Sequence, residues 1–112
     1  MRNKSFFLTQ EQYRNRTKTV TRRQCKRTPQ VGEQFMGIVK GQGIKKGEKV
    51  EKMHSSTITH VWWEMINTIS PQEVVKEGFP GKHPFWFIAM YCKANNCKPT
   101  DLCCRIEFKH DI

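Results

Sequence analysis

The segment Ser70-Pro71-Gln72-Glu73 is the local signal that most constrains the fold of this chain. Serine is a favoured N-cap, proline suits the first helical position, and a glutamate three residues after the cap completes a capping box. The sequence therefore predicts a helix from Pro71 to about Glu77, which Gly78 ends. A second helix is predicted over residues 84–94, and its expected buried face contains Phe85, Ile88, Ala89 and Cys92.

Segments rich in β-branched residues lie on both sides of these helices, so the helices sit between strands. Strands are predicted over residues 18–23, 34–40 and 103–108, and two more within 49–69, with a turn near His54-Ser55-Ser56. The pattern Thr9-Gln10-Glu11-Gln12 predicts a short first helix that begins at Thr9 and ends near Asn15. Because no β-α-β unit repeats, we expect an α+β fold: a small, mostly antiparallel or mixed β-barrel with two to three packed helices.

The length of 112 residues suits one domain over residues 1–112, with one continuous core. Hydrophobic residues make up 37% of the chain and are spread along it, which favours a packed globular fold over disorder. No segment approaches the ~18 consecutive apolar residues of a membrane span, and the N-terminus lacks the pattern of a signal peptide. We therefore expect a cytoplasmic protein without a membrane partner.

The charge is strongly positive and uneven. The net charge is +10, and no acidic residue falls between Arg14 and Arg27, a stretch that holds seven lysines and arginines. Such a segment attracts phosphate or another polyanion. A solvated face that keeps the protein soluble is the other interpretation. Charge thus favours an anionic partner without identifying it.

The five cysteines are odd in number and follow no signal peptide, which predicts reduced thiols. A zinc site is the alternative interpretation, because four cysteines lie close together in the sequence: Cys92, Cys97, Cys103 and Cys104. However, the chain has no Cys-x-x-Cys pair, and adjacent Cys103 and Cys104 would point to opposite faces of a strand. We therefore expect no metal site.

The stretch Lys18-Thr19-Val20-Thr21-Arg22-Arg23, followed by Gly32-Glu33, resembles the ASCH domain family, in which a Lys-Thr-x-Thr-x-Arg stretch precedes a Gly-Asp/Glu turn and a strand. The helix end near Gly78 and the closing segment 104–108 are also similar, so the resemblance spans nearly the whole chain. One departure is Arg22, which stands where the family has an apolar residue. The resemblance implies a PUA-like barrel, a fold associated with RNA and modified bases.

One branch of small bacterial ASCH proteins is similar in length and hydrolyses N4-acetylcytidine and related N4-acylated cytosines without metal or cofactor. Resemblance to that branch implies catalytic roles for Lys18, Thr21 and Glu77, with Glu73 as the competitor for the glutamate. In such a reaction Thr21 would attack the acyl carbonyl, Lys18 would act as base, and Glu77 would protonate the leaving N4. On an ideal strand Lys18 and Thr21 face opposite sides, so direct proton transfer requires a bulge or turn.

Further residues are candidates for substrate contacts. Cytosine needs flat apolar faces, and the aromatic candidates are Phe6, Phe7, Phe79, Trp62 and Trp63, of which we select Phe7 and Trp63, together with Arg23. Arg16, Arg22 and Arg23 are the candidates for nucleic-acid or anion contact. The alternative function is a non-catalytic module that binds RNA or single-stranded nucleic acid. A nuclease lacks a sequence-level mechanism, since no clustered carboxylates or paired histidines are visible.

Overall fold

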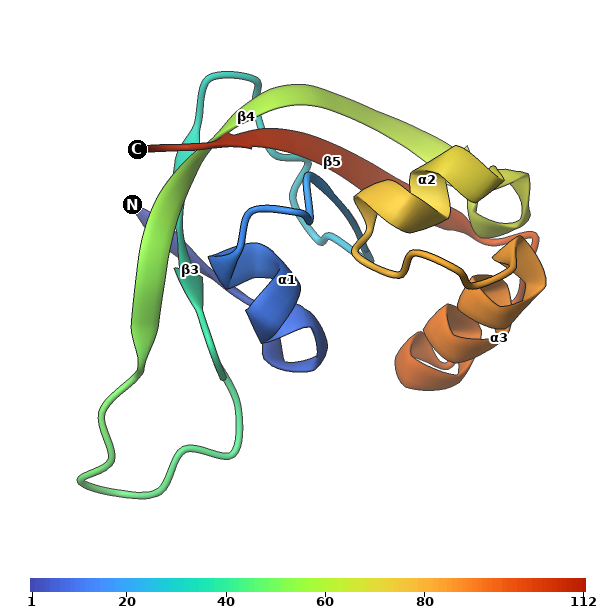
Figure 1. Cartoon of the computed structure of the whole chain (residues 1–112). Helices are drawn as coiled ribbons and strands as arrows, with labels where there is room; N and C mark the ends of the chain where they lie inside the picture. Colours follow the sequence, from blue (N-terminus) through green and yellow to red (C-terminus); the bar gives the residue numbers. More distant parts are fainter.

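A curled mixed sheet of five strands forms the body of the molecule, which the computed structural model describes over all 112 residues (Figure 1). The strands are β1 (Arg2–Ser5), β2 (Val20–Arg23), β3 (Gln34–Ile38), β4 (Lys52–Met65) and β5 (Leu102–His110), in the spatial order β1-β3-β4-β5-β2. β1 and β3 pair in parallel, and the other neighbours are antiparallel. The predicted α+β class with a mostly antiparallel or mixed sheet is confirmed.

Three helices accompany the sheet. The 3₁₀ turn η1 (Phe7–Thr9) leads into α1 (Gln10–Arg14), and the 3₁₀ turn η2 (Ile66–Thr68) precedes α2 (Pro71–Lys76) and α3 (Pro84–Asn95). Figure 1 shows α1 in the hollow of the curled sheet, with α2 and α3 together at one end of β4 and β5. None of these helices is long and apolar enough to cross a membrane.

The core consists of two buried groups that follow this arrangement. The first lies inside the curl and brings Phe6 and Tyr13 against residues of β3, β4 and β5, including Phe35 and Phe108. The second packs α2 and α3 on the end of the sheet, through Val74, Phe87 and neighbouring apolar side chains. The sheet is open between its edge strands β1 and β2. We call this gap the seam, which Arg23 bridges by donating from Nη2 to the Ser5 carbonyl at 2.7 Å.

The region predicted as two strands is instead the single long strand β4, so the turn expected at His54-Ser55-Ser56 is wrong. The side chains of these residues bond to distant partners rather than to a local turn. Ser55 Oγ donates to Asp111 Oδ2 at 2.6 Å, and Ser56 Oγ lies 2.7 Å from the Tyr13 hydroxyl. These tertiary contacts hold the segment extended, and β4 bends instead at an irregularity between Ile58 and His60.

The predicted helix signals have mixed outcomes. Ser70 caps α2 as expected, because its Oγ accepts a hydrogen bond from the Glu73 N–H at 3.2 Å. The capping box at Thr9 is wrong: Thr9 makes no side-chain cap and is buried at the end of η1. The predicted buried face of α3 is also wrong in part, since Phe85 is 75% exposed and the buried residues are Phe87, Ile88 and Tyr91. The α3 sequence is apolar nearly all round, so its spacing did not single out one face.

Candidate functional site

A buried ion pair joins two segments that are far apart in the sequence. Lys18 Nζ donates to Glu77 Oε1 at 2.8 Å and to the Glu77 backbone carbonyl at 2.7 Å. Both side chains are less than 5% exposed. Burial lowers the pKa of Lys18 below its ordinary value of 10.5, and the charges of Arg23 and Arg22 add to this effect against the opposing attraction of Glu77. The lysine is thus an amine whose proton is held less tightly than usual.

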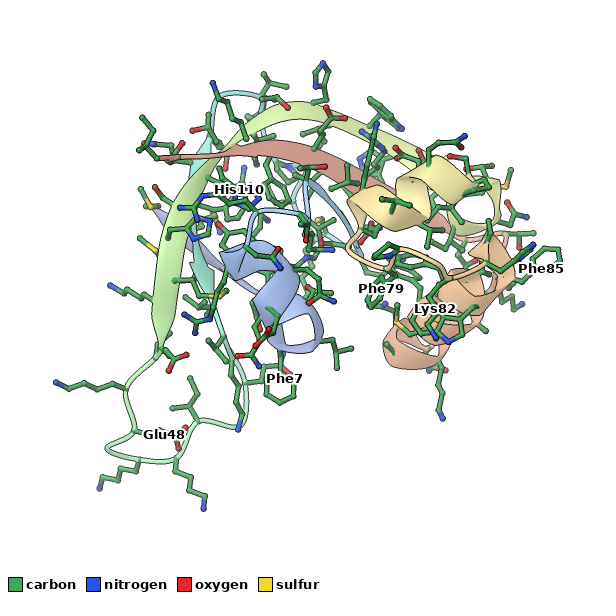
Figure 2. The ribbon with its side chains drawn as sticks, in the orientation of Figure 1. Phe7, Glu48, Phe79, Lys82, Phe85 and His110 are labelled. Carbon is green, nitrogen blue, oxygen red and sulfur yellow. The ribbon has the colours of Figure 1, made fainter.

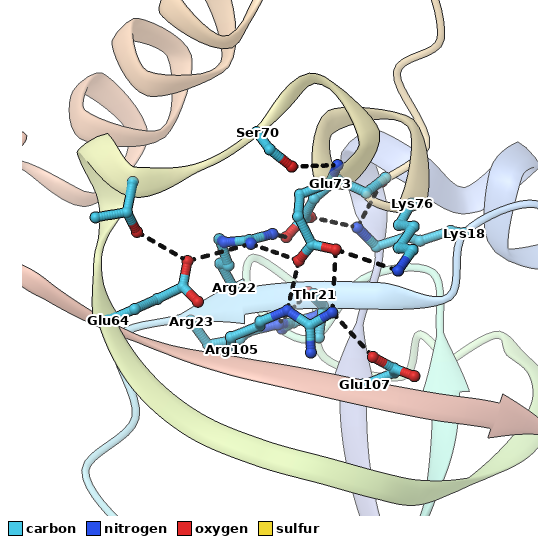
Figure 3. Close-up of polar contacts among 12 residues, drawn as sticks. Lys18, Thr21, Arg22, Arg23, Glu64, Ser70, Glu73, Lys76, Arg105 and Glu107 are labelled. Atoms are coloured by element: carbon cyan, nitrogen blue, oxygen red, sulfur yellow. Dashed lines mark hydrogen bonds and ion pairs between the residues drawn. The ribbon is translucent and has the colours of Figure 1, made fainter.

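Arg22 links this pair to a wider network of charges (Figure 3). Its guanidinium donates to Glu77 Oε2 at 3.0 Å and to Glu73 Oε1 at 2.7 Å. Arg105 also donates to both oxygens of Glu73. Burial acts to raise the pKa of Glu73, but the hydrogen bonds from Arg105 and Arg22 outweigh it and hold that pKa at about 2. Glu73 is therefore a fixed carboxylate that orients two arginines.

The local backbone explains how Glu77 reaches Lys18. α2 ends at Lys76, and Gly78 has φ of +107°, a conformation that only glycine adopts without strain. The chain reverses at this glycine, and a Cβ there would meet the Gln12 side chain at 3.1 Å. The Thr19 N–H donates to the Lys76 carbonyl at 2.9 Å, which fastens the start of β2 to the end of α2. The two segments are thereby held side by side with Lys18 facing Glu77.

The pair forms the polar part of a small cavity between η1 and α3. The cavity has a volume of about 130 Å³. Lys18, Arg22 and Glu77 meet there with mainly apolar residues, and the full lining also includes Leu8, Thr9, Phe79, Phe87, Met90, Tyr91, Ala94 and Asn95. Figure 2 shows Phe79 on the side of the α2–α3 connection that faces α1, whereas Phe85 points away at the far side of α3. A flat, weakly polar ligand fits the chemistry of this lining.

Thr21 is not joined to this pair by a hydrogen bond. The Thr21 side chain is buried, and its Oγ1 accepts from Arg23 Nε at 3.1 Å. Arg23 in turn lies over the Phe6 ring at 4.9 Å and bonds to Ser5, so it faces the seam rather than α2. Side chains alternate along β2, which places Thr21 and Arg23 on one face and Arg22 on the other. Of the three residues implied by the resemblance, the structure pairs Lys18 with Glu77 and places Thr21 beside Arg23.

Of the other selected candidate residues, only Arg22 lines the cavity. Phe7 lines a different, larger hollow of about 590 Å³ beside β1. Trp63 donates from its indole N–H to Thr28 Oγ1 at 3.3 Å on the outer part of β4. Arg16 is exposed, and its side chain bonds only to the Arg14 carbonyl. Arg22, selected as an anion contact, is committed to internal carboxylates instead.

Sequence reasoning missed the α3 wall of the cavity. Phe87 and Tyr91 line it, and burial raises the pKa of the Tyr91 hydroxyl, which accepts a hydrogen bond from Gln24 at 2.9 Å. Thr9 adds a hydroxyl group from η1. Phe79 was among the aromatic candidates but was not selected. In an apolar helix no local signal separates residues that line a cavity from those that fill a core.

A pair of histidines, His54 and His110, contacts the backbone of Lys18. His110 Nε2 lies 2.7 Å from the Lys18 carbonyl, so this nitrogen carries the proton and donates. His110 Nδ1 lies 2.7 Å from His54 Nε2 and must then accept from it while both rings are neutral. Burial lowers the pKa of both histidines below their ordinary value of 6.5. The two neutral rings therefore connect the curled sheet to the backbone of the site lysine.

No set of three or more histidine, cysteine, aspartate or glutamate residues is arranged to hold a metal ion, and all five cysteines are free thiols. The charged residues of the cavity are Lys18, Arg22 and Glu77, which are in direct contact. The arrangement suits proton transfer and the binding of a polar atom on a flat ligand.

No protein-family model and no curated protein matches the sequence. Solved structures do match its fold. An ASCH domain from Lactobacillus crispatus JV V101 aligns over 97% of this chain and 79% of its own, with a TM-score of 0.63 and 16% identity. A DUF984 protein from Enterococcus faecalis V583 aligns over 89% of this chain and 67% of its own, with a TM-score of 0.63 and 12% identity. The chain therefore has the fold of an ASCH domain, in agreement with the expected PUA-like architecture.

Proposed function

We propose that this protein is an amidohydrolase that removes acyl groups from N4-acylated cytosine nucleosides such as N4-acetylcytidine. The observation that carries the proposal is the buried Lys18–Glu77 pair at the edge of a mainly apolar cavity. Apolar and aromatic side chains suit the faces of a cytosine ring, while the ion pair supplies the proton transfers that amide hydrolysis needs. The ASCH-like fold and the Lys-Thr-x-Thr-x-Arg resemblance support the same substrate class.

The pair holds an acid and a base in one unit. Lys18 Nζ and Glu77 Oε1 are 2.8 Å apart, so a proton that moves from the ammonium to the carboxylate leaves a neutral amine and a carboxylic acid. The amine takes a proton from the attacking nucleophile. The carboxylic acid protonates N4 of the cytosine as the C–N bond breaks. The lowered pKa of Lys18 favours this arrangement, because the neutral amine forms more readily than in an ordinary lysine.

Thr21 is the nucleophile in this proposal. Its Oγ1 bonds to the acyl carbon, the cytidine leaves with a proton on N4, and water then hydrolyses the acyl-threonine ester to the free acid. Arg23 Nε donates to this oxygen at 3.1 Å and stabilises negative charge that develops on it. No hydrogen bond joins Thr21 to Lys18. The proton of the Thr21 hydroxyl therefore reaches Lys18 through an intervening water, or Lys18 moves to accept it directly. Direct attack by water is the competing route within the same function.

In the route in which water attacks, Arg22 contributes a donor for the developing oxyanion, because it lies on the face of β2 opposite Thr21 and lines the cavity. Its side chain is 1% exposed and lines the cavity, and its Nε is buried without a hydrogen-bond partner. A buried N–H without a partner is costly, so a ligand oxygen that accepts from it gains a favourable contact. The carbonyl oxygen of the acyl group becomes an oxyanion during attack and is the ligand atom that this donor suits best.

Hydrolysis of N4-acetylcytidine by the purified protein, followed by the change in ultraviolet absorbance, tests the proposal. We expect turnover by the wild-type chain and losses of about 100-fold or more in kcat/KM for Lys18→Met and Glu77→Gln, since general acid–base catalysis typically contributes this much. Lys93→Met is the matched control, because Lys93 is exposed on α3 and does not line the cavity. Circular dichroism checks that each variant is folded.

Thr21 variants separate the two routes. As the nucleophile, Thr21 is replaceable by serine with a loss of less than about tenfold but not by alanine, which loses the attacking oxygen. Full activity in folded Thr21→Ala assigns the attack to water and removes this residue from the mechanism. The function itself fails if the wild-type chain shows no turnover, or if folded Lys18→Met is as active as wild type.

A further inference from the structure

A third cavity lies in the seam, away from the Lys18–Glu77 pair. It has a volume of about 400 Å³ and is formed by β1 on one side and by the connection between β2 and β3 on the other. Four of its seven lining residues are cations: Arg2, Lys4, Lys26 and Arg27. None of these residues lines the first cavity. The cavity is therefore a separate and strongly basic feature.

The positive charge in this cavity is largely uncompensated. Glu33 is the carboxylate that pairs here, and both of its oxygens accept from Arg27 at 2.9 Å, while Oε1 also accepts from the Gln30 N–H at 2.8 Å. Arg2, Lys4 and Lys26 take part in none of the ion pairs of the molecule. Three cations thus share one cavity without a carboxylate of their own.

Lys4 shows that this crowding is more than a solvated surface. Its side chain is only partly exposed and lies 5.7 Å from the Phe35 ring centroid. Burial lowers the pKa of Lys4, and the nearby charge of Arg23 lowers it further. An ammonium group that is partly desolvated beside other cations gains free energy when an anion binds. β1 adds to this, since an edge strand leaves backbone N–H groups free on its outer side.

The lining of the cavity suits an anion with several oxygen atoms. The cations come from two separate chain segments around one cavity, and such a spread suits several phosphate oxygens at once.

We propose that the seam is a phosphate-binding site, which takes the phosphate groups of a nucleotide or of single-stranded nucleic acid through Arg2, Lys4 and Lys26. This site does not depend on the amidohydrolase proposed above, since it shares no lining residue with the Lys18–Glu77 cavity. It explains where the excess positive charge acts, given that Arg22 is committed to internal carboxylates.

Titration calorimetry with two probes tests the site: inorganic pyrophosphate and a short single-stranded oligocytidylate. We expect both to bind the wild-type chain, and the double substitution Lys4→Gln/Lys26→Gln to weaken both by about tenfold or more. Lys45→Gln/Lys46→Gln is the matched control, because it removes the same charge from the exposed β3–β4 loop and is expected to change pyrophosphate binding little. Hydrolysis of N4-acetylcytidine, which has no phosphate, is expected to be unchanged in both double variants.

Comparison of the probes identifies the source of the phosphate. Tighter binding of the oligonucleotide, with a steep salt dependence that Lys4→Gln/Lys26→Gln reduces, supports a nucleic-acid backbone. Equal affinity for the two probes supports a nucleotide. The proposal is overturned if pyrophosphate does not bind, or if the two double variants weaken its binding equally. Lys26→Gln alone, at an exposed position, repeats the test if the change at Lys4 disturbs folding.

Discussion

Arg22 is the residue on which the charge balance of the site depends. It donates to carboxylates from three places: Glu77 after α2, Glu73 within α2, and Glu64 on β4 at 3.3 Å. Its own side chain is 1% exposed. Charges out of water are stable only while their partners remain, so the arginine and the carboxylates stabilise one another. Arg22 thereby ties α2 to β2 and β4.

Replacement of this arginine by an apolar residue tests that dependence. We expect Arg22→Met to lower the free energy of unfolding by about 3 kcal/mol or more, because it leaves buried Glu77 and half-buried Glu73 with fewer partners. Arg14→Met is the control: Arg14 pairs with Glu51 at the surface, where such pairs contribute at most about 1 kcal/mol. Urea denaturation measures both. Equal losses of unfolding free energy in the two variants would show that the buried network stabilises the fold no more than a surface ion pair does.

At the scale of the elements, the turn after α2 positions the site. Gly78 allows the chain to reverse with φ of +107°, and the space at its Cα is closed by Gln12. Gln12 Nε2 also donates to the Gly78 carbonyl at 3.2 Å, so α1 is fastened to the same turn. The turn thus sets the position of Glu77 relative to Lys18, because both helices meet there.

A side chain at this turn should disturb both stability and chemistry. We expect Gly78→Ala to cost about 1 kcal/mol or more in the free energy of unfolding, since alanine is strained at positive φ and its Cβ presses on Gln12. The same change displaces Glu77 and should reduce kcat/KM for N4-acetylcytidine. Gly81→Ala provides the comparison, because Gly81 also has positive φ but a Cβ there would meet no atom within 4 Å. If Gly81→Ala reduces kcat/KM as much as Gly78→Ala does, the contact with Gln12 has no part in catalysis.

Elements with local signals could be predicted from the sequence, and those shaped by distant contacts could not. The Ser70 cap and the Gly78 stop depend on neighbours within the same turn, and both are present in the structure. The segment 54–56 has the composition of a turn, yet its side chains bond to Tyr13, Asp111 and His110, which come from other parts of the chain. Tertiary hydrogen bonds outweighed local propensity there.

The candidate site shows the same division. Lys18 and Glu77 are 59 positions apart, and only the resemblance to a family placed them in one site. Alternation along β2 explains why Thr21 and Arg22 lie on opposite faces of the strand. The commitment of Arg22 to internal carboxylates could not be predicted, because a basic run in the sequence does not show which cations are buried. The cavity wall from η1 and α3 depends on how these elements pack, which no local pattern reports.

At the scale of the whole molecule, the histidine pair connects the neighbouring strands β4 and β5 to the site. His54 lies on β4, His110 ends β5, and the Lys18 carbonyl precedes β2. The Tyr13 ring of α1 stacks on His54 at 4.4 Å. Arg14 and Arg16 oppose protonation of His54, Arg16 also opposes it at His110, and Asp111 favours it at both rings. Burial remains the largest influence and keeps both rings neutral.

This arrangement makes stability dependent on pH in a defined window. The folded pKa of each histidine lies below the ordinary 6.5, so the unfolded chain binds more protons as the pH falls through that value. We therefore expect the free energy of unfolding to be largest above about pH 7 and to decrease toward about pH 5.5. Glu33 and Glu73 do not contribute in this range, since their ordinary pKa of 4.5 lies below it and the folded values of about 2 lie lower still.

Urea denaturation across this pH range measures the effect, and substitution assigns it. His54→Gln/His110→Gln should flatten the dependence, because glutamine has no proton to gain, and the amide still donates to the Lys18 carbonyl. His60→Gln serves as the control, since His60 is 60% exposed and its removal should leave the slope unchanged. A slope that persists in the double variant would place the titrating group elsewhere. A slope that disappears would show that the same two rings which hold the Lys18 backbone limit the stability of the whole fold at acid pH.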